Sequence, residues 1–274
     1  MNHARADIDL MLVHRVFHMD HLHLGRSEPG KPITWDGARD AQREFTRHLI
    51  TRIPAGTKTI LDVGCGIGSG TKMLQDAGFA PEGVNPDPYQ KRVFEAALPG
   101  VPFHHRTFES FEPAKAYDLV LFSESAQYVK LPGFFPGCAK ALGPGTGGAV
   151  LVADWFCKPG KTFFGEPHDD AAFRAAATAA GFSLKFEEDI TAHALPTVEF
   201  LSAFHRDWVV PAVDAAGEIA RERMPVWAGL ARVLLGGRIN KVYHRMTDGW
   251  AAQFNPATFR ESVNYRILLF TRGG

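Results

Sequence analysis

Three glycines at alternate positions form the feature of this sequence with the clearest chemical meaning. Gly64, Gly66 and Gly68 follow the short apolar run 59–63. Because glycine has no side chain, the backbone at these positions can approach a bound molecule closely. A helix expected from Gly70 adds free N–H groups at a positive helix end, which suit a polar ligand group. The pattern therefore predicts a ligand-binding turn, and a tight strand–helix turn without a ligand is the alternative.

The spacing of these glycines distinguishes the turn from two other glycine motifs. Gly-x-Gly-x-Gly departs from the Gly-x-Gly-x-x-Gly spacing of dinucleotide-binding turns. No Lys-Ser or Lys-Thr pair follows at the offset that a phosphate-binding P-loop requires. A nucleoside triphosphate is therefore disfavoured as the ligand.

Short apolar runs alternate with helical patterns on both sides of the turn. The expected strands are 59–63, 81–84, 101–106, 117–123, 149–154, 182–187 and 265–271, and the expected helices are 36–53, 70–77, 89–98, 134–142 and 170–180. This alternation predicts an α/β fold with a doubly wound, mostly parallel sheet of seven strands, covered on both faces. Ligands of such sheets bind at the carboxyl ends of the strands, where the glycine turn lies.

Two segments stand outside this alternation. Residues 1–53 are rich in histidine near their start and end in an amphipathic helix, so we expect an N-terminal helical cap. Residues 196–256 contain helical pieces punctuated by prolines and a Gly-Gly pair, and we expect a helical lid, inserted before the last strand, that helps to bind substrate. Residues 54–195 and 257–274 then form the ligand-binding core.

Composition limits the classes of function. The chain has 274 residues, 45% of them hydrophobic, so it can bury a sizeable core. Its 30 Lys and Arg balance 30 Asp and Glu, which argues against a nucleic-acid partner. Three cysteines without a CxxC pair predict neither a disulfide framework nor a metal site. Without a leader-like or long apolar segment, we expect a cytoplasmic protein that does not contact membranes and is a monomer or homodimer.

Longer stretches of the chain resemble a known family. TILDVGCGIGSG, residues 59–70, resembles the first motif of class I S-adenosylmethionine-dependent methyltransferases. Further similarity to the small-molecule subgroup, which includes sterol and tocopherol methyltransferases, lies in HLHLG, GVNPDPYQ, FHHRTFESFEP, YDLVLFSESAQYV and LGPGTGG. The resemblance covers about residues 20–155. It implies a Rossmann-like methyltransferase fold, S-adenosyl-L-methionine as the cofactor and a small-molecule methyl acceptor.

The same resemblance implies a set of cofactor contacts. The residues expected to bind the cofactor are Asp62, Gly64, Cys65, Gly66, Gly68, Asn85, Pro86, Gln90, Thr107, Phe108, Glu109 and Ser123. By the resemblance, Asp62 lies near the ammonium group, Asn85 near the ribose hydroxyls and Phe108 beside the adenine ring. Asn85 and Thr107 stand where many relatives carry an acidic residue. The alternatives are that Asp62 binds N–H groups of its own turn and that residues 85–88 form an ordinary turn.

Methyl transfer needs a nucleophile aligned with the sulfonium methyl group, exclusion of water and, for a hydroxyl or acidic carbon, a general base. The residues expected to be catalytic are Glu124, Tyr128, His205 and His244. The first two follow the fourth expected strand, and the histidines lie in the expected lid. The alternatives are that Glu124 caps the next segment, that Tyr128 packs in the core and that the histidines are surface or packing residues.

Aromatic and aliphatic residues crowd the expected lid, which favours a small apolar or aromatic metabolite of specialised metabolism as the acceptor. They are Phe200, Phe204, Trp208, Trp227, Leu230, Leu234 and Leu235, whose helical spacing also fits a stripe facing the core. The locally basic stretch 221–248 indicates a solvated face, with an anionic substrate group as the alternative. Two other functions stay open: a nicotinamide-dependent oxidoreductase, and a non-catalytic protein that keeps the methyltransferase fold to bind a ligand.

Overall fold

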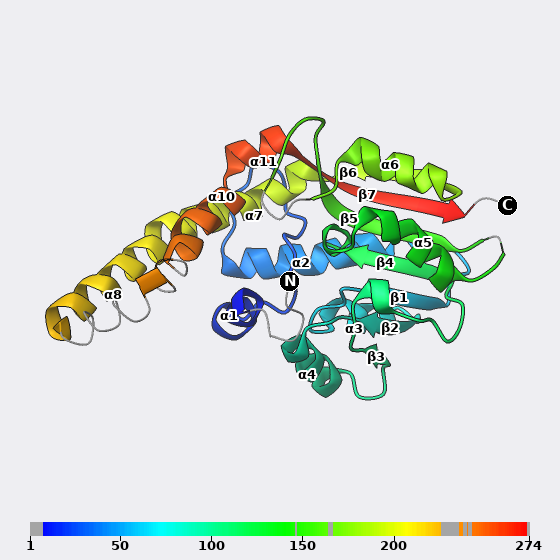
Figure 1. Ribbon diagram of the computed structural model, residues 1–274, viewed down its shortest axis with the longest axis horizontal. Coiled ribbons are helices and arrows are strands. Elements are labelled where there is room, and N and C mark those ends of the chain that lie inside the picture. The colour runs from blue at the N-terminus through cyan, green and yellow to red at the C-terminus, as the bar shows by residue number, and fades with distance from the viewer. Residues whose placement is uncertain are drawn as a thin grey trace.

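The computed structural model describes residues 8–145, 147–163, 167–225, 236–237, 240 and 243–272. Seven strands form one sheet in the order β3-β2-β1-β4-β5-β7-β6 (Figure 1). Their bounds are β1 Thr59–Val63, β2 Ala80–Val84, β3 Phe103–His104, β4 Leu119–Ser123, β5 Ala149–Cys157, β6 Phe182–Asp189 and β7 Val263–Arg272. The strands from β1 to β5 pair in parallel, and β7 lies antiparallel between β5 and β6. The predicted α/β fold with a mostly parallel, seven-stranded sheet is confirmed.

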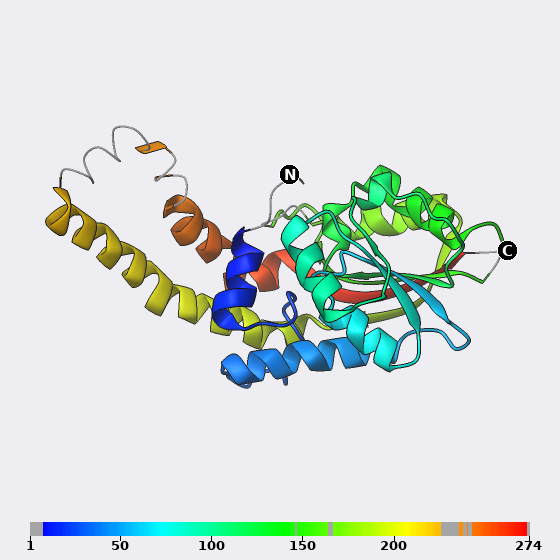
Figure 2. The same ribbon diagram turned by 90° about the horizontal axis from the view of Figure 1, so that it is seen from below.

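Helices cover both faces of the sheet and extend beyond it (Figures 1 and 2). The helices that pack on the sheet or at its edge are α2 Trp35–Ile50, α3 Ser69–Asp76, α4 Pro88–Ala97, α5 Leu131–Leu142, α6 Asp170–Ala179, α7 Thr191–Phe204 and α11 Pro256–Ser262. The others are α1 Ile8–Phe17, η1 Phe108–Ser110, η2 Ala126–Tyr128, η3 His205–Val209, α8 Val210–Arg223, η4 Arg245–Gly249 and α10 Trp250–Gln253. Side-chain caps fix where several begin, because Thr34, Asp87 and Asp169 accept hydrogen bonds from N–H groups of the first turns of α2, α4 and α6.

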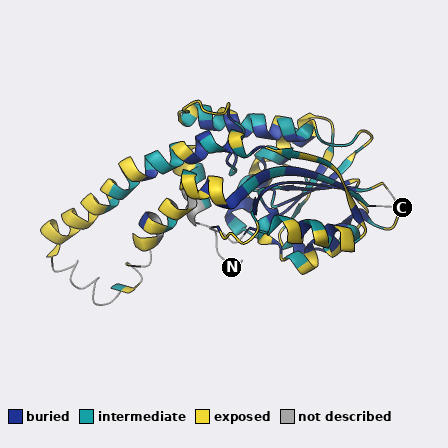
Figure 3. Ribbon diagram, turned by 90° about the horizontal axis from the view of Figure 1, so that it is seen from above, coloured by how far each residue is buried: buried dark blue, intermediate teal, exposed yellow. Residues whose placement is uncertain are grey.

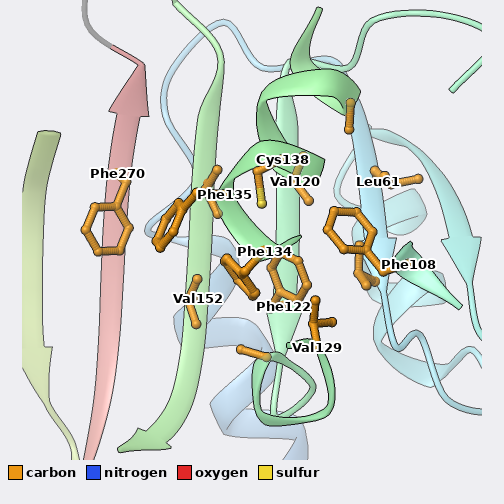
Figure 4. Close-up of a cluster of buried hydrophobic side chains, with 14 of the residues drawn as sticks. Leu61, Phe108, Val120, Phe122, Val129, Phe134, Phe135, Cys138, Val152 and Phe270 are labelled. Atoms are coloured by element: carbon orange, nitrogen blue, oxygen red, sulfur yellow. The ribbon is translucent and has the colours of Figure 1, made fainter. Parts of the chain in front are cut away.

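Two apolar clusters hold the layers together. On one face, Phe134 and Phe135 of α5 point toward Phe122 and Val152 of the sheet and toward Phe270 of β7 (Figure 4). On the opposite face α2, α3, α7 and α11 pack on the sheet through a second cluster. Both faces of the sheet are therefore covered by packed helices, and the loops after β1, β2 and β4 meet at its carboxyl edge.

A helical arm leaves the sheet between β6 and β7. The α7 helix continues through η3 into α8, and α8 projects away from the sheet (Figures 1 and 2). No side chain of α8 is buried (Figure 3). Trp208 in η3 is 70% exposed. Near the start of the arm, Phe200 and Phe204 pack on Trp35 of α2. Of the described members of the expected stripe, Phe200 and Phe204 pack against α2 and Trp208 is exposed. Trp227, Leu230, Leu234 and Leu235 lie outside the described residues.

The structure also differs from the sequence-based expectations at two element boundaries. The strand expected over 101–106 pairs only through Phe103 and His104 at the edge of the sheet. The boundary expected between the core and the lid, at residues 195 and 196, falls inside α7, which begins at Thr191 and contains Pro196. No helix among the described residues is both long and apolar enough to cross a bilayer.

Candidate functional site

A cavity of about 690 Å³ opens at the carboxyl ends of β1, β2 and β4. Its volume lies within the range of about 300–1,000 Å³ that is typical of small-molecule sites. The predicted residues that line it are Asp62, Gly64, Cys65, Gly66, Asn85, Pro86, Gln90, Thr107, Phe108, Glu109, Ser123, Glu124 and Tyr128. The fold thus gathers at one site residues that lie more than sixty positions apart in the sequence.

The glycines of the turn have different structural roles. Gly64 has a φ of +74°, and a Cβ built on it would collide with the side chain of Ser125. Gly66 has a φ of +59°, and a Cβ there would find nothing nearer than Leu22 Cδ1 at 3.9 Å. Gly64 therefore lets the turn pack against the β4 loop, whereas Gly66 presents bare backbone to the cavity. Gly68 does not line the cavity, contrary to expectation; it precedes α3 as the N-cap residue.

Asp62 lies beneath this turn, on the face of the sheet that α3 covers. Its carboxylate accepts a hydrogen bond of 2.6 Å from the Thr71 hydroxyl, not from the N–H groups of its own turn. Burial raises the pKa of Asp62 to about 6. A cationic group in the cavity would restore the carboxylate's charged form, so Asp62 can hold an ammonium group.

The loop after β2 is both a turn and part of the cavity wall. Asn85 donates from Nδ2 to Gln90 Oε1 at 2.8 Å, and its Oδ1 accepts from the Asp87 N–H at 2.8 Å. Asp87 in turn accepts from the N–H groups of Tyr89 and Gln90 at the start of α4. Because the Asn85 amide is engaged at both ends, the Gln90 NH₂ group has the greater capacity to bind a ligand hydroxyl.

Phe108 forms the flat side of the cavity. Its ring packs edge-on against the ring of Phe122, with 5.3 Å between the ring centroids. A Cβ atom added at Gly137 would come within 2.8 Å of the Phe108 ring. The neighbouring Thr107 hydroxyl bonds Ser110 Oγ at 3.1 Å, and Glu109 is exposed. Phe108 is therefore held in place by packing and can flank a planar ring.

Glu124 has the least usual geometry in the cavity. It has a φ of +50°, a conformation that costs energy for a residue with a side chain. Its Oε1 atom accepts hydrogen bonds from the Leu24 N–H at 2.7 Å and from the Tyr265 hydroxyl at 2.5 Å. Its Oε2 atom has no hydrogen-bond partner among the described residues, and the side chain lines the cavity. Glu124 is thus not a helix cap.

Burial controls the charge of Glu124. Removal from water raises its pKa to about 8, and the nearby carboxylate of Asp154 contributes in the same direction. Asp154 is itself buried, with a pKa raised to about 7, and it accepts hydrogen bonds from the N–H groups of Ala126, Gln127 and Trp155. Asp154 therefore fixes the backbone of the loop that carries Glu124.

The cover of the cavity comes from the N-terminal segment. His21, Leu22 and His23 line the cavity, and both histidines lie within 3.4 Å of Thr46 Oγ1 on α2. Burial lowers the pKa of His21 to about 4 and that of His23 well below its usual range. Both histidines are therefore neutral at physiological pH.

The described residues of the expected lid lie elsewhere. The cavity lining ends at Lys130, so within the described part of the chain no residue of 196–256 reaches it. His205 is buried in η3, and His244 is exposed, with its Nδ1 2.8 Å from Asp248. The structure therefore brings Glu124 together with Tyr128, whose side chain is 60% exposed at the rim, but does not bring either histidine to them.

Tyr265 and Asp154 are site residues whose roles the sequence did not reveal. Tyr265 lies on β7, far along the chain from Glu124, and nothing near it resembles a motif. Asp154 interrupts the buried apolar run of β5, and a carboxylate inside such a run is the signal that could have marked it as a buried hydrogen-bond acceptor.

Comparisons with known proteins agree with this geometry. A family model described as a methyltransferase domain matches residues 38–182. The chain is 27% identical over 233 residues to 2-methyl-6-phytyl-1,4-hydroquinone methyltransferase of Synechocystis sp., covering 78% of this chain and 68% of that protein. It is 29% identical over 200 residues to trans-aconitate 2-methyltransferase of Acidovorax sp., covering 67% of this chain and 77% of that one.

Solved structures share the fold. Geranyl diphosphate C-methyltransferase from Streptomyces coelicolor aligns over 96% of this chain and 92% of its own, with a TM-score of 0.67 and 15% identity. The [4+2]-cyclase SpnF aligns over 92% and 87%, with a TM-score of 0.64 and 20% identity. At these identities the likeness concerns the fold alone.

Proposed function

The chain belongs to the methyltransferase domain family, and we propose that it transfers the methyl group of S-adenosyl-L-methionine to a small, uncharged, apolar or aromatic metabolite by in-line displacement. It is an S-adenosylmethionine-dependent methyltransferase of the small-molecule type. This membership argues against the nicotinamide-dependent oxidoreductase, and the curated methyltransferase relatives favour an enzyme over a non-catalytic protein with the same fold. We place the reaction in specialised metabolite biosynthesis.

The residues in the cavity fit the cofactor, which supplies a sulfonium-activated methyl group. The open backbone at Gly66 leaves room for the cofactor's amino acid end, and Asp62 has the charge to hold its ammonium group. The Gln90 amide, assisted by Asn85, can bind the ribose hydroxyls, and Phe108 can flank the adenine ring. Gly68 does not form part of the cavity wall, and its role in the site is to begin α3 as the N-cap residue.

The charges around the cavity favour an uncharged acceptor. The acidic lining residues among those described are Asp20, Asp62, Asp87, Glu109 and Glu124, and the basic ones are Arg106 and Lys130. Both basic side chains belong to exposed residues near the adenine side, around Thr107. A carboxylate or diphosphate placed beside Glu124 would have to be desolvated without a cationic partner from the described lining, at a large cost in free energy.

Glu124 carries the chemical part of the proposal, because its Oε2 atom is available to a ligand in the cavity. For a hydroxyl acceptor this oxygen takes the proton as the new bond to carbon forms. For an alkene acceptor the same carboxylate stabilises the developing cation and then removes a proton. A positive charge in the cavity would lower the pKa of Glu124 from its raised value of about 8 and so would favour the carboxylate that either role requires.

A panel of three acceptors tests this function. Methylhydroquinone, trans-aconitate and geranyl diphosphate are each incubated with the protein and cofactor labelled in the methyl group, and transfer of label is measured. We expect label in the neutral phenol and turnover at least tenfold lower with either anion. Faster turnover of an anion would overturn the uncharged acceptor. Turnover of none of the three, together with no binding of S-adenosylhomocysteine, would overturn the proposed site.

A further inference from the structure

Part of the cavity lining is apolar and comes from α2, from the turn just after it, from α3 and from β4, and we call this part the apolar branch. The residues that line this branch are Thr46, Leu49, Ile50, Ile53, Leu74 and Leu121. The first four recur at the spacing of one helix face, so α2 and the residues just after it turn a continuous stripe toward the cavity.

The register of the sheet places this branch below the cofactor turn. Leu121 of β4 pairs with Asp62 of β1, so both side chains point to the same face of the sheet. Thr46 lies at the carboxyl edge beside His23, and Ile53 lies near the opposite edge, where the chain approaches β1. At 1.5 Å per helical residue, the stretch from Thr46 to Ile53 is about 10 Å long.

The walls of the branch are apolar and match a hydrocarbon chain. Leu49, Leu74 and Leu121 are buried, and Ile50 and Ile53 are partly buried. The hydroxyl of Thr46 is already occupied by the Gln42 carbonyl at 3.3 Å. None of the six lining side chains carries a charge, so a polar chain would lose its hydrogen bonds to water here without replacing them.

We propose that this branch holds the aliphatic tail of the methyl acceptor. The methylated group then lies beside Glu124, and the acceptor is an uncharged amphiphile with a linear or branched hydrocarbon chain. The inference rests on the proposed function, because the tail enters the branch only from an acceptor bound in the same cavity. The branch residues line the same cavity as Gly66 and Glu124, so a tail in the branch can belong to a molecule whose head group lies beside Glu124.

A pair of substitutions on neighbouring residues tests the branch. Ile50→Phe fills it, and Ile53→Phe fills its far end, whereas Thr51→Phe adds the same ring at an exposed position that does not line the cavity. Each protein is saturated with S-adenosylhomocysteine and titrated calorimetrically with 4-methylphenol and with 4-octylphenol, two neutral phenols that differ in chain length.

We expect the wild-type protein and Thr51→Phe to bind 4-octylphenol at least tenfold more tightly than 4-methylphenol. In Ile50→Phe and Ile53→Phe we expect this advantage to fall below threefold, with the affinity for S-adenosylhomocysteine unchanged. An equal advantage in all four proteins, or none in the wild type, would overturn the branch while leaving the proposed function standing. Failure of the wild type to bind S-adenosylhomocysteine would instead count against the proposed function.

Discussion

The hydroxyl of Tyr265 donates a hydrogen bond of 2.5 Å to Oε1 of Glu124, across 141 positions of sequence. This bond ties the last strand to the loop after β4, and the Leu24 N–H binds the same oxygen from the N-terminal cover. Three distant segments thus orient one carboxyl group. The result is a fixed Glu124 whose other oxygen is left for the acceptor.

Glu124→Gln tests the chemical role of that oxygen. The amide keeps the size of the side chain but cannot take a proton, so we expect kcat to fall by a factor of about 10² or more. The affinity for S-adenosylhomocysteine should stay within threefold. Glu95→Gln, an exposed substitution on α4, is the control and should leave both values unchanged. Full turnover by Glu124→Gln would show that the carboxylate is not needed.

Tyr265→Phe tests whether Tyr265 positions and tunes Glu124. The hydrogen bond from Tyr265 lowers the pKa of Glu124, opposing the effect of burial. Removing it should therefore raise that pKa and move the rise of the pH–rate profile to higher pH. A variant that loses activity with an unshifted profile would indicate that Tyr265 serves packing alone.

The raised pKa of Glu124 also makes stability depend on pH. The folded protein holds the proton up to a pKa of about 8, whereas the unfolded chain releases it near 4.5. Wild-type stability should therefore fall relative to Glu124→Gln as pH rises from about 5 to about 8, and the difference should level off above that. Urea unfolding of both proteins at pH 5, 6.5 and 8 measures the difference in their free energies of unfolding. A constant difference would contradict the raised pKa.

Gly66→Ala tests whether Gly66 contacts the cofactor, in contrast to Gly64 and Gly68, which pack against side chains. The new methyl group faces the cavity, so we expect the Kd for S-adenosylhomocysteine to rise at least tenfold. Gly78→Ala is a matched control, because Gly78 also has a positive φ of +92° but has nothing within 4 Å of a Cβ. Both variants should lose about 1 kcal/mol of unfolding free energy from backbone strain. Equal affinities in the two would remove Gly66 from the site.

His244→Ala addresses the expected catalytic role of the lid. The residue is exposed, bonded to Asp248 and absent from the cavity lining. We expect kcat and KM to stay within twofold of the wild type. A hundredfold loss would show that 196–256 reaches the acceptor during turnover.

Local sequence predicted the parts of the site that are built locally. The apolar run at β1 and the glycines after it lie within one strand–turn–helix unit. The apolar run therefore predicted the bounds of β1, and the glycines predicted that the cavity lies at its carboxyl end. The resemblance to the methyltransferase family predicted that Asp62, Gln90 and Phe108 contribute to the site, and all three side chains line the cavity.

The parts that depend on distant packing were not predictable in the same way. Helical periodicity cannot say which neighbour a helix meets, so the sequence did not show that α8 projects away from the sheet (Figure 1). The bond between Tyr265 and Glu124 joins residues with no local relation. Nor could the residue type of Asn85 reveal that its amide is already engaged by Gln90 and Asp87.

A crystal structure of the protein with S-adenosylhomocysteine tests the central claim most directly. We expect the nucleoside in this cavity, with its amino acid end over Gly66, its adenine beside Phe108 and its sulfur directed toward the side of the cavity that holds Glu124. A nucleoside bound elsewhere, or one whose sulfur is turned away from Glu124, would contradict it.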